Sequence, residues 1–385
     1  MPEQNRQPKL LLTLFCTIIF ILGFEIGGFQ LALLRSANEL GFDGAIMGLP
    51  ISIQFISLSF FPLVFGPISD KIGKKTIIMI FMAVFTVGCF FIWMSSSISE
   101  FLVGIFVMSA GLGVCESSLT AAISDTYPEK GENYINLSQS FLCIGAIISP
   151  LVLQTLMDER FLSWRINFLI CAISMAAVIP LLIPIKMKTV TKGKHTKDNN
   201  RKENPFLIFG FIICIFIYIG IESSVSYFAD TIFTLELNAP AYGAYAISFF
   251  WAAMAAGRFY FGRINKIPTY AVAISLFVLG IVLVCIIFFR QEVVMLVLFT
   301  AAGLACSCIW PGIVNSAFSL KSSSSGKIMS YLYLGSGIGG MLIPLIFGAI
   351  MNLSNMSYSF LLLTVLSFGA GAYMWKNTKK ESITE

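Results

Sequence analysis

Apolar stretches long enough to cross a lipid bilayer follow one another along almost the whole of this 385-residue chain. A helix that crosses the hydrocarbon core needs about 20 consecutive apolar residues. Twelve stretches meet this requirement, at about residues 10–31, 46–66, 76–95, 101–123, 136–157, 163–185, 205–229, 241–262, 269–289, 293–313, 327–350 and 357–375. Because the loops between them are short, almost no room remains for a soluble domain. We therefore expect an all-α membrane protein with twelve transmembrane helices.

The composition agrees with this expectation. Charged residues make up 12% of the chain, hydrophobic residues make up 57%, and the mean hydropathy is +0.85. A soluble domain carries about 25% charged residues. The first stretch contains Glu25 and has no small-residue cleavage site, so we expect a retained span rather than a signal peptide. All nine cysteines fall in predicted spans, which favours apolar packing over disulfides.

Lysines and arginines are concentrated in alternate loops, including the segment 66–75, the segment 186–204 and both termini. Cytoplasmic loops of membrane proteins carry such an excess of basic residues. We therefore predict a multi-pass protein of the cell (inner or plasma) membrane with both termini in the cytoplasm. The formal net charge of +5 follows from these loops, and we expect no nucleic-acid partner.

The chain divides into two similar halves. The only long hydrophilic insert, 186–204, separates six predicted spans from six others. We predict an N-terminal six-helix bundle at 1–185, a cytoplasmic central loop at 186–204 and a C-terminal six-helix bundle at 205–385.

Three short patterns repeat between the halves at offsets of 197, 196 and 194 residues. One of them is Gly23-Phe24-Glu25, which corresponds to Gly220-Ile221-Glu222, and another is Gly145-x4-Pro150, which corresponds to Gly339-x4-Pro344. Repeated halves are typical of transporters that hold their substrate near the bilayer midplane.

Four ionisable residues lie deep in predicted spans: Glu25, Glu116, Glu222 and Arg258. A charge at mid-span costs roughly 2.5–3.5 kcal/mol on insertion scales, so such residues are functional candidates. A buried carboxyl without a basic neighbour favours its neutral form, and a charge that depends on water access suits proton coupling. We therefore consider Glu116, Glu222 and Glu25 as proton-coupling groups and Arg258 as part of an inner gate. Helix-to-helix hydrogen bonding by a protonated glutamate, and snorkelling of the arginine, are the structural alternatives.

Amide and aromatic side chains recur on the same spans. They make up most of the substrate-binding candidates, which are Gln30, Asn136, Gln139, Glu222, Trp251, Trp310, Asn315 and Tyr333. Amides both donate and accept hydrogen bonds, and an aromatic face packs on the C–H face of a sugar ring. The pattern therefore favours a small polar solute, although such residues also join helices or mark the membrane interface.

Motifs for other function classes are missing from the sequence. There is no G-x-x-x-x-G-K-[ST] loop, and no H-E-x-x-H or G-x-S-x-G motif. The only histidine, His195, lies in the central insert. We therefore expect no enzyme activity, no cofactor and no metal. The expected partners are a small-molecule substrate, protons and the lipid bilayer, with the chain acting as a monomer.

The loop after the second span has the pattern G-x-x-x-D-K-x-G-K-K and resembles the loop motif of the major facilitator superfamily. The matching residues are Gly66, Asp70, Lys71, Gly73, Lys74 and Lys75. The resemblance implies two six-helix bundles and a cytoplasmic latch formed by these residues. The corresponding position of the second half holds Lys266 in place of an aspartate, so only the first latch is expected.

Shorter motifs are similar to the fucose/glucose/galactose:proton symporter branch of that superfamily. They include Gly111-x-Gly113-x-x-Glu116, the segment 136–141, Tyr218-Ile219-Gly220-Ile221-Glu222 and the segment 248–258. This likeness implies that Glu116 couples to the proton and that Asn136 and Gln139 contact sugar. Two departures are Thr120, where that branch has asparagine, and Gln30, where the fucose permease has an acid.

Together these features predict a secondary active transporter that imports a small polar solute such as a sugar with protons, by alternating access. One alternative is a proton-driven exporter of drugs or other hydrophobic compounds. Another is a transport-inactive membrane sensor that keeps the same fold.

Overall fold

The computed structural model describes residues 6–42, 46–127, 131–160, 162–185, 187, 205–261, 268–319 and 325–381. Helices dominate this part of the chain, and no strand occurs in it. The predicted all-α fold class is therefore confirmed. Most of the predicted central loop, 186–204, and with it His195, lies outside the described residues.

The chain forms two compact units, each of which we describe by itself. Unit 1 consists of Met1–Phe42 and Ile53–Gly193, and unit 2 consists of Asp43–Ser52 and Lys194–Glu385. The short segment Asp43–Ser52 therefore groups with the second unit, although it lies within the predicted N-terminal bundle in the sequence. It includes Ser52, whose Oγ donates a hydrogen bond of 2.7 Å to the carbonyl of Met341.

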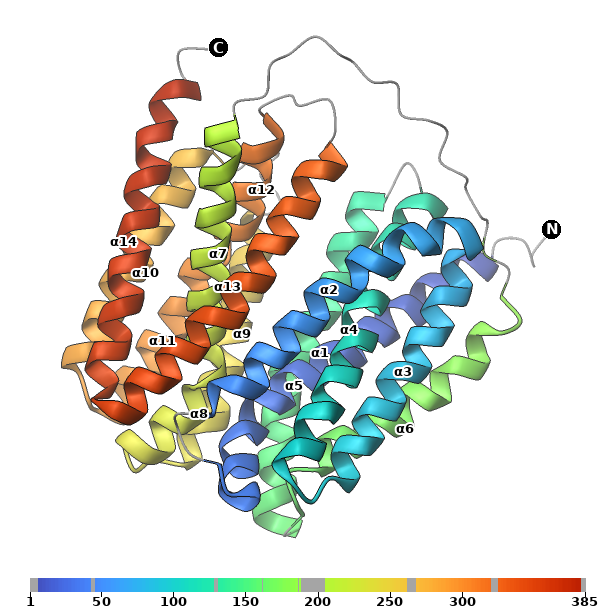
Figure 1. The fold of residues 1–385 in the computed structure, drawn as a ribbon, viewed down its shortest axis with the longest axis horizontal. Helices are drawn as coiled ribbons and strands as arrows, with labels where there is room; N and C mark the ends of the chain where they lie inside the picture. Colours follow the sequence, from blue (N-terminus) through green and yellow to red (C-terminus); the bar gives the residue numbers. More distant parts are fainter. Residues whose placement is uncertain are drawn as a thin grey trace. The chain divides into compact units, whose positions relative to one another are not determined.

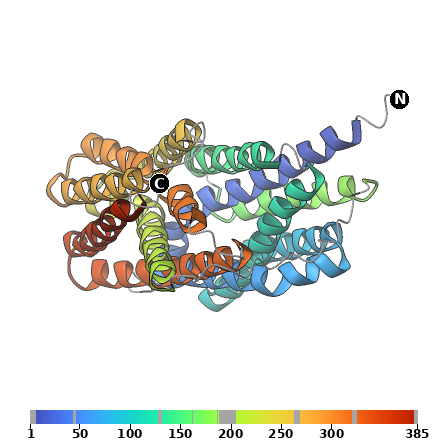
Figure 2. The same cartoon turned by 90° about the horizontal axis from the view of Figure 1, so that it is seen from above.

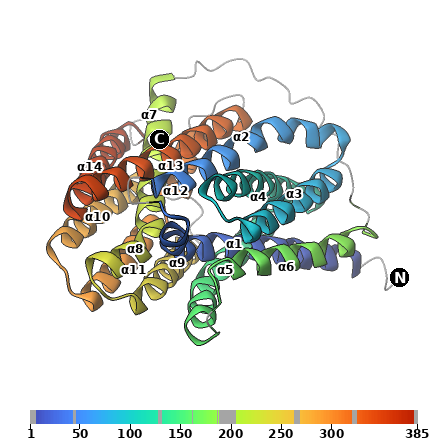
Figure 3. The same cartoon turned by 60° about the horizontal axis from the view of Figure 1, so that its bottom comes forward.

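The described part of the first half of the chain forms six helices. They are α1 (Arg6–Leu40), α2 (Gly48–Ile72), α3 (Lys74–Met94), α4 (Ile98–Thr126), α5 (Gly131–Arg160) and α6 (Ile166–Leu182). In unit 1, α1 lies along α5, as Figure 2 shows for the dark blue and green helices, and α3 lies along α4 (Figure 3). Helix α6 packs against α3 and α1, and α4 also contacts α5 and α1, so α4 contributes buried residues to the interior of this unit.

The second half contains α7 (Pro205–Tyr227), α8 (Ala229–Thr231), the π-helix η1 (Ile232–Glu236), α9 (Ala241–Phe261), α10 (Thr269–Phe288), α11 (Glu292–Cys306), α12 (Ile309–Ser319), α13 (Ser325–Leu353) and α14 (Met356–Glu381). Helix α10 lies beside α14, and α13 lies beside α7 (Figure 1). Helix α9 packs along α11.

Each of the twelve predicted stretches falls on helical structure. Within the described residues, ten helices are long and apolar enough to cross a membrane. Helix α6, with 17 residues, is apolar but shorter, and α9 falls outside the group of ten. The twelve-helix count is consistent with this arrangement.

The predicted stretch 293–313 is not one continuous helix. It is divided at Ser307 and Cys308 into α11 and α12. Pro311 has no backbone N–H and therefore cannot donate to the carbonyl of Ser307, four residues earlier. Proline is tolerated in the first turn of a helix, which is where Pro311 lies in α12.

The predicted stretch 205–229 also ends differently from expectation. Helix α7 stops at Tyr227, and the chain continues through α8 into the π-helix η1. The N–H of Leu237 donates to the carbonyl of Ile232, the five-residue spacing that defines a π-helix. Pro240 lies beyond this segment, where it cannot donate to a continuing helix.

Candidate functional site

A carboxylate and an amide meet in unit 1, and both belong to the predicted set. Nε2 of Gln139, on α5, donates to Oε1 of Glu116, on α4, over 3.4 Å. Both side chains are half-buried. The Thr120 hydroxyl donates to the backbone carbonyl of Glu116 rather than to its carboxylate. One neighbour of this intramembrane acid is therefore a neutral amide that can also bind a polar ligand.

Asn136 lies one helical turn before Gln139 on the same face of α5. Its side chain is exposed, and its backbone carbonyl accepts a hydrogen bond from Ser140. Asn136 and Gln139 therefore present two amides along one edge of α5, next to Glu116. Gln30, on α1, is 1% exposed and is engaged in an interaction with another group.

Glu25 differs from Glu116 in that the protein encloses it completely. Its exposure is 0%, and neither carboxylate oxygen has a hydrogen-bond partner among the described residues. The thiols of Cys89, on α3, and Cys171, on α6, lie within electrostatic range of this carboxylate. Glu25 therefore points into the interior of unit 1.

In unit 2, Glu222 lies on α7 one turn beyond Tyr218, which is fully buried. Arg258, on α9, lies within electrostatic range of both side chains. The structure therefore brings together an acid and a base that the sequence analysis assigned to different roles, Glu222 to coupling and Arg258 to an inner gate.

The aromatic candidates of unit 2 separate into a pair and a buried single residue. The rings of Trp310, on α12, and Tyr333, on α13, have centroids 5.6 Å apart at an interplanar angle of 57°. Asn315 is half-buried on α12, below Trp310 by more than one turn. Trp251 is 6% exposed on α9, where it packs edge-on against Phe250.

The loop motif joins α2 to α3. Gly73 has φ 98° and ψ 131°, a conformation that side chains rarely adopt, so glycine is required at this junction. Lys74 forms an ion pair with Asp125 at the end of α4. Lys75 donates to the carbonyls of Ile183, at 2.7 Å, and Ile185, at 2.8 Å, just beyond α6.

These contacts place the two lysines in ion pairs and hydrogen bonds within unit 1. The other motif residues contribute less to the described contacts. Lys71 is exposed, a Cβ added at Gly66 would meet open space, and the side chain of Asp70 lies outside the described part. Asp125, the partner of Lys74, was not anticipated, because its pairing depends on the packing of α3 against α4.

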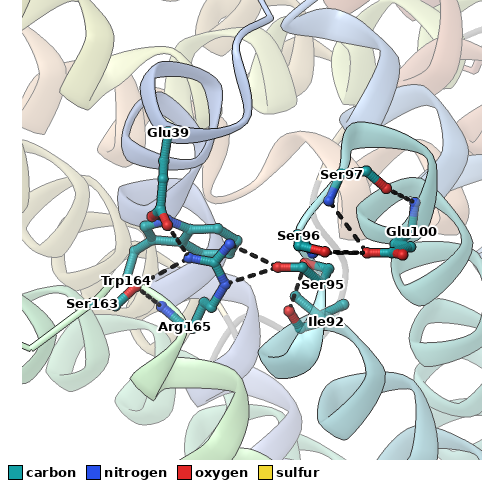
Figure 4. A network of polar contacts seen from close by, with 9 residues as sticks. All are labelled: Glu39, Ile92, Ser95, Ser96, Ser97, Glu100, Ser163, Trp164 and Arg165. Carbon is teal, nitrogen blue, oxygen red and sulfur yellow. Dashed lines mark hydrogen bonds and ion pairs between the residues drawn. The ribbon is translucent and has the colours of Figure 1, made fainter.

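A second polar network, which the sequence analysis also missed, joins three helices of unit 1 (Figure 4). Glu39, in the last turn of α1, accepts a hydrogen bond of 2.6 Å from Nε1 of Trp164 and pairs with Arg165. Nη2 of Arg165 donates to the carbonyl of Ser95 over 2.7 Å, and its guanidinium stacks on the Trp164 ring. This network fixes the end of α1 against the end of α3 and the start of α6.

Asp230 is a further acid that sequence reasoning missed. It is fully buried on α8, and a Cβ added at Gly243 would lie 2.1 Å from its Oδ1. Asp230 lies four residues after Ser226 and eight after Glu222, a spacing that places polar side chains on one face of a helix, and this spacing could have identified it. As for metals, the described residues contain no group of three or more His, Cys, Asp and Glu that could hold an ion.

Glutamates within apolar helices, a basic loop motif and two helical units define the class of a membrane transporter. The profile of the Major Facilitator Superfamily matches residues 13–290 and 211–384. The chain therefore belongs to the Major Facilitator Superfamily and is a multi-pass membrane protein. Members of this family move small molecules across membranes and are transporters rather than enzymes.

The curated relatives carry names of two different kinds. The chain is 25% identical over 220 residues to multidrug resistance protein MdtL of Shewanella sp. (strain ANA-3), covering 56% of this chain and 55% of the relative. It is 33% identical over 136 residues to "Probable plastidic glucose transporter 1" of Arabidopsis thaliana, covering 34% and 26%. The matched region thus spans about half the length of the first relative and a quarter of the second.

Solved structures share the fold. The transporter FucP aligns with a TM-score of 0.63 at 17% identity, covering 94% of this chain and 98% of the other. The POT family transporter PepTSo aligns with a TM-score of 0.73 at 13% identity, covering 97% and 99%. These likenesses confirm the predicted fold and carry no information on substrate.

Proposed function

We propose that this protein is a proton-coupled importer of a small polar solute, with sugars as the favoured class. The observation that carries the proposal is the hydrogen bond of 3.4 Å between Gln139 and Glu116. It joins an intramembrane carboxylate to an amide, so a ligand that engages the amide changes the surroundings of the acid.

Glu116 is the proposed proton carrier. Acids within membrane spans mark ion pathways and proton relays. Glu116 is half-buried, and the amide that donates to it adds no charge to the pair. Protonation of Glu116 weakens its demand for the Gln139 donor, and Gln139 then becomes available to a solute hydroxyl.

In unit 1, the proposed solute contacts are the amides Asn136 and Gln139. In unit 2, taken by itself, the proposed candidates are Trp310, Tyr333 and Asn315. The tilted pair of Trp310 and Tyr333 offers an aromatic surface, and amides supply both donors and acceptors. Gln30 and Trp251 are proposed as supporting residues, because both are almost completely buried.

Glu222 and Glu25 are proposed as further coupling carboxyls, and Glu222 also as a solute contact. The proximity of Arg258 favours an acid–base exchange with Glu222 over the inner-gate role that the sequence suggested. The remaining motif residues, Gly66, Asp70, Lys71, Gly73, Lys74 and Lys75, are proposed as the cytoplasmic gate. The protein is further proposed to act as a monomer in the cell membrane with both termini in the cytoplasm.

Uptake into proteoliposomes tests the proposal. The purified chain is reconstituted, an inward pH gradient is imposed, and accumulation is measured for a panel of sugars, amino acids and drugs. We expect gradient-dependent uptake of at least one sugar above the level of protein-free vesicles. Absence of uptake for every polar solute would contradict an importer of this kind.

A proton-driven exporter is the second candidate, and the 220-residue similarity to MdtL supports it. The direction of flux separates the two functions. An exporter extrudes a hydrophobic cation against its gradient when protons enter, and an importer accumulates a polar solute under the same gradient. A chain that moves neither class of compound, yet binds a solute, would instead be a transport-inactive sensor.

A further inference from the structure

The hydroxyl of Tyr218, on α7, is enclosed within unit 2 beside the carboxyl group of Glu222. Tyr218 lies four residues before Glu222, and residues at this spacing are neighbours on one face of a helix. The two side chains are close enough to interact. Oη of Tyr218 and Oε2 of Glu222 are both buried, and neither has a formed hydrogen bond among the described residues. A buried donor and a buried acceptor thus lie about one helical turn apart, each suited to satisfy the other.

Other hydroxyls on this part of α7 are satisfied by the backbone. Ser224 donates to the carbonyl of Gly220 over 2.7 Å, and Ser223 donates to a carbonyl of the same helix. Short side chains in helices ordinarily bond in this way, whereas the hydroxyl of a tyrosine lies beyond a rigid ring and cannot turn back to its own helix. A buried hydroxyl without a partner is costly, so phenylalanine would suit position 218 better if packing were the only task there.

Neighbouring helices bring a base and a thiol to the same pair. Arg258, on α9, and Cys306, at the end of α11, each lie within electrostatic range of both members of the pair. A separate contact supports this placement, because a Cβ added at Gly257 would lie 2.2 Å from Oγ of Ser307. Since these two residues adjoin Arg258 and Cys306 in the sequence, α9 meets the end of α11 at the level of the pair.

Other titratable groups of the described helices around α7 lie at other levels or are exposed. Asp230, on α8, lies about two turns beyond Glu222. Tyr373, on α14, reaches the opposite end of α7, where its hydroxyl lies 3.5 Å from the carbonyl of Leu207. The tyrosines of α13 are exposed, and α12 carries no titratable side chain. Tyr373 is therefore a matched control, because it belongs to the same unit but lies away from Glu222.

We propose that Tyr218 is a positioning residue, which holds Glu222 by donating its hydroxyl to the charged carboxylate. The inference rests on the role of Glu222 as a coupling carboxyl in the proposed function. A hydrogen bond to an ionised carboxylate is stronger than one to a neutral carboxyl group, so the bond favours the ionised form. Tyr218 thereby helps Glu222 to release its proton and fixes the direction in which the carboxylate points.

Infrared difference spectroscopy of the purified full-length chain tests this role without a transported solute. The C=O band of protonated carboxyl groups is titrated with pH, and the part that belongs to Glu222 is the part that Glu222→Gln removes. Glu236→Gln, which changes an exposed acid on η1, is the control for this assignment. We expect Tyr218→Phe, which keeps the ring and removes only the hydroxyl, to move the midpoint of the Glu222 band upward by about one pH unit. Tyr373→Phe should leave this midpoint unchanged.

Two further measurements separate positioning from packing. Replacement of all tyrosines by fluorotyrosine makes the phenol a stronger donor and should move the midpoint downward, which gives the comparison if Tyr218→Phe fails to fold. In proteoliposomes, adding Tyr218→Phe to Glu222→Gln should change the pH profile of solute uptake no further, because Tyr218 acts through Glu222.

Three results would overturn the inference. The first is the same midpoint in Tyr218→Phe and in the wild type, even if the Tm falls, since Tyr218 would then serve packing alone. The second is an equal shift in Tyr373→Phe. The third is the absence of any titrating band that Glu222→Gln removes, since Glu222 would then exchange no proton. A wild type that carries no solute would instead contradict the proposed function, and the spectroscopic comparison would still decide the role of Tyr218.

Discussion

The two units each place a half-buried glutamate within an apolar helix, but the neighbours of the two carboxylates differ. In unit 1, Glu116 accepts a hydrogen bond from the neutral amide of Gln139. In unit 2, Glu222 lies within electrostatic range of Arg258. An amide neighbour adds no charge beside an acid, whereas a basic neighbour favours the charged form of that acid. The comparison teaches that the two acids, both coupling candidates by sequence, have different surroundings and are suited to different tasks.

Replacement of the unit 1 acid should have the largest effect. In Glu116→Gln we expect accumulation of solute under a pH gradient to fall by at least about 100-fold, because no group remains to carry the proton. Exchange of labelled for unlabelled solute should persist, since that process needs no net proton movement. Uptake and exchange are measured in the same proteoliposomes, with Glu236→Gln as the matched control. Normal accumulation in Glu116→Gln would remove this residue from the coupling step.

Removal of the base in unit 2 should have the next largest effect. Arg258→Ala removes the cation that lies within electrostatic range of Glu222. Because Arg258 is only half-buried, we expect the free energy of unfolding to fall by about 2 kcal/mol. The double variant Glu222→Gln/Arg258→Ala should recover part of the lost Tm. Additive losses of Tm in the two single variants and the double variant would show that the two groups act independently.

Truncation of the unit 1 amide should produce an intermediate effect on affinity. Gln139→Ala removes a donor and acceptor for the solute, and the loss of such a hydrogen bond corresponds to about a tenfold increase in KM. The Tm and the expression level should remain close to those of the wild type, because the side chain is only half-buried. An unchanged KM together with a lower Tm would assign Gln139 to helix packing instead.

The network of Glu39, Trp164 and Arg165 should give the smallest effect. The pair is partly exposed, with 49% exposure for the Glu39 side chain, and exposed ion pairs contribute about 0.2–1 kcal/mol. Glu39→Gln should therefore lower the Tm by no more than about 4 °C and leave KM unchanged. A large loss of transport without a loss of Tm would show that this network takes part in the transport cycle.

Much of the fold could be predicted from the sequence, because the bilayer requires long apolar stretches. All twelve predicted stretches fall on helices, and the boundaries of α3 and α10 agree within about two residues. The division at Ser307 and the π-helix at Ile232–Glu236 were not predicted. Both interrupt apolar sequence without a change in hydropathy, so a count of apolar residues does not detect them.

The candidate site was predictable only in part. The presence of Glu116, Gln139 and Glu222 could be read directly, because an ionisable or amide side chain is conspicuous in an apolar span. The faces that these helices present to one another could not be read from the sequence. Lipid-facing and protein-facing sides of a membrane helix are both apolar, so the hydrophobic periodicity that marks the buried face of a soluble helix is lost. The Lys74–Asp125 pair and the cluster around Glu25 depend on such tertiary contacts.

Proton movement coupled to solute movement is the most direct measurement of the central claim. Solute is added outside proteoliposomes without an imposed gradient, and the external pH is recorded with wild type and with Glu116→Gln. The account predicts that a transported sugar alkalinises the medium with wild type and leaves it unchanged with Glu116→Gln. Solute uptake by the wild type with no accompanying pH change would contradict the account.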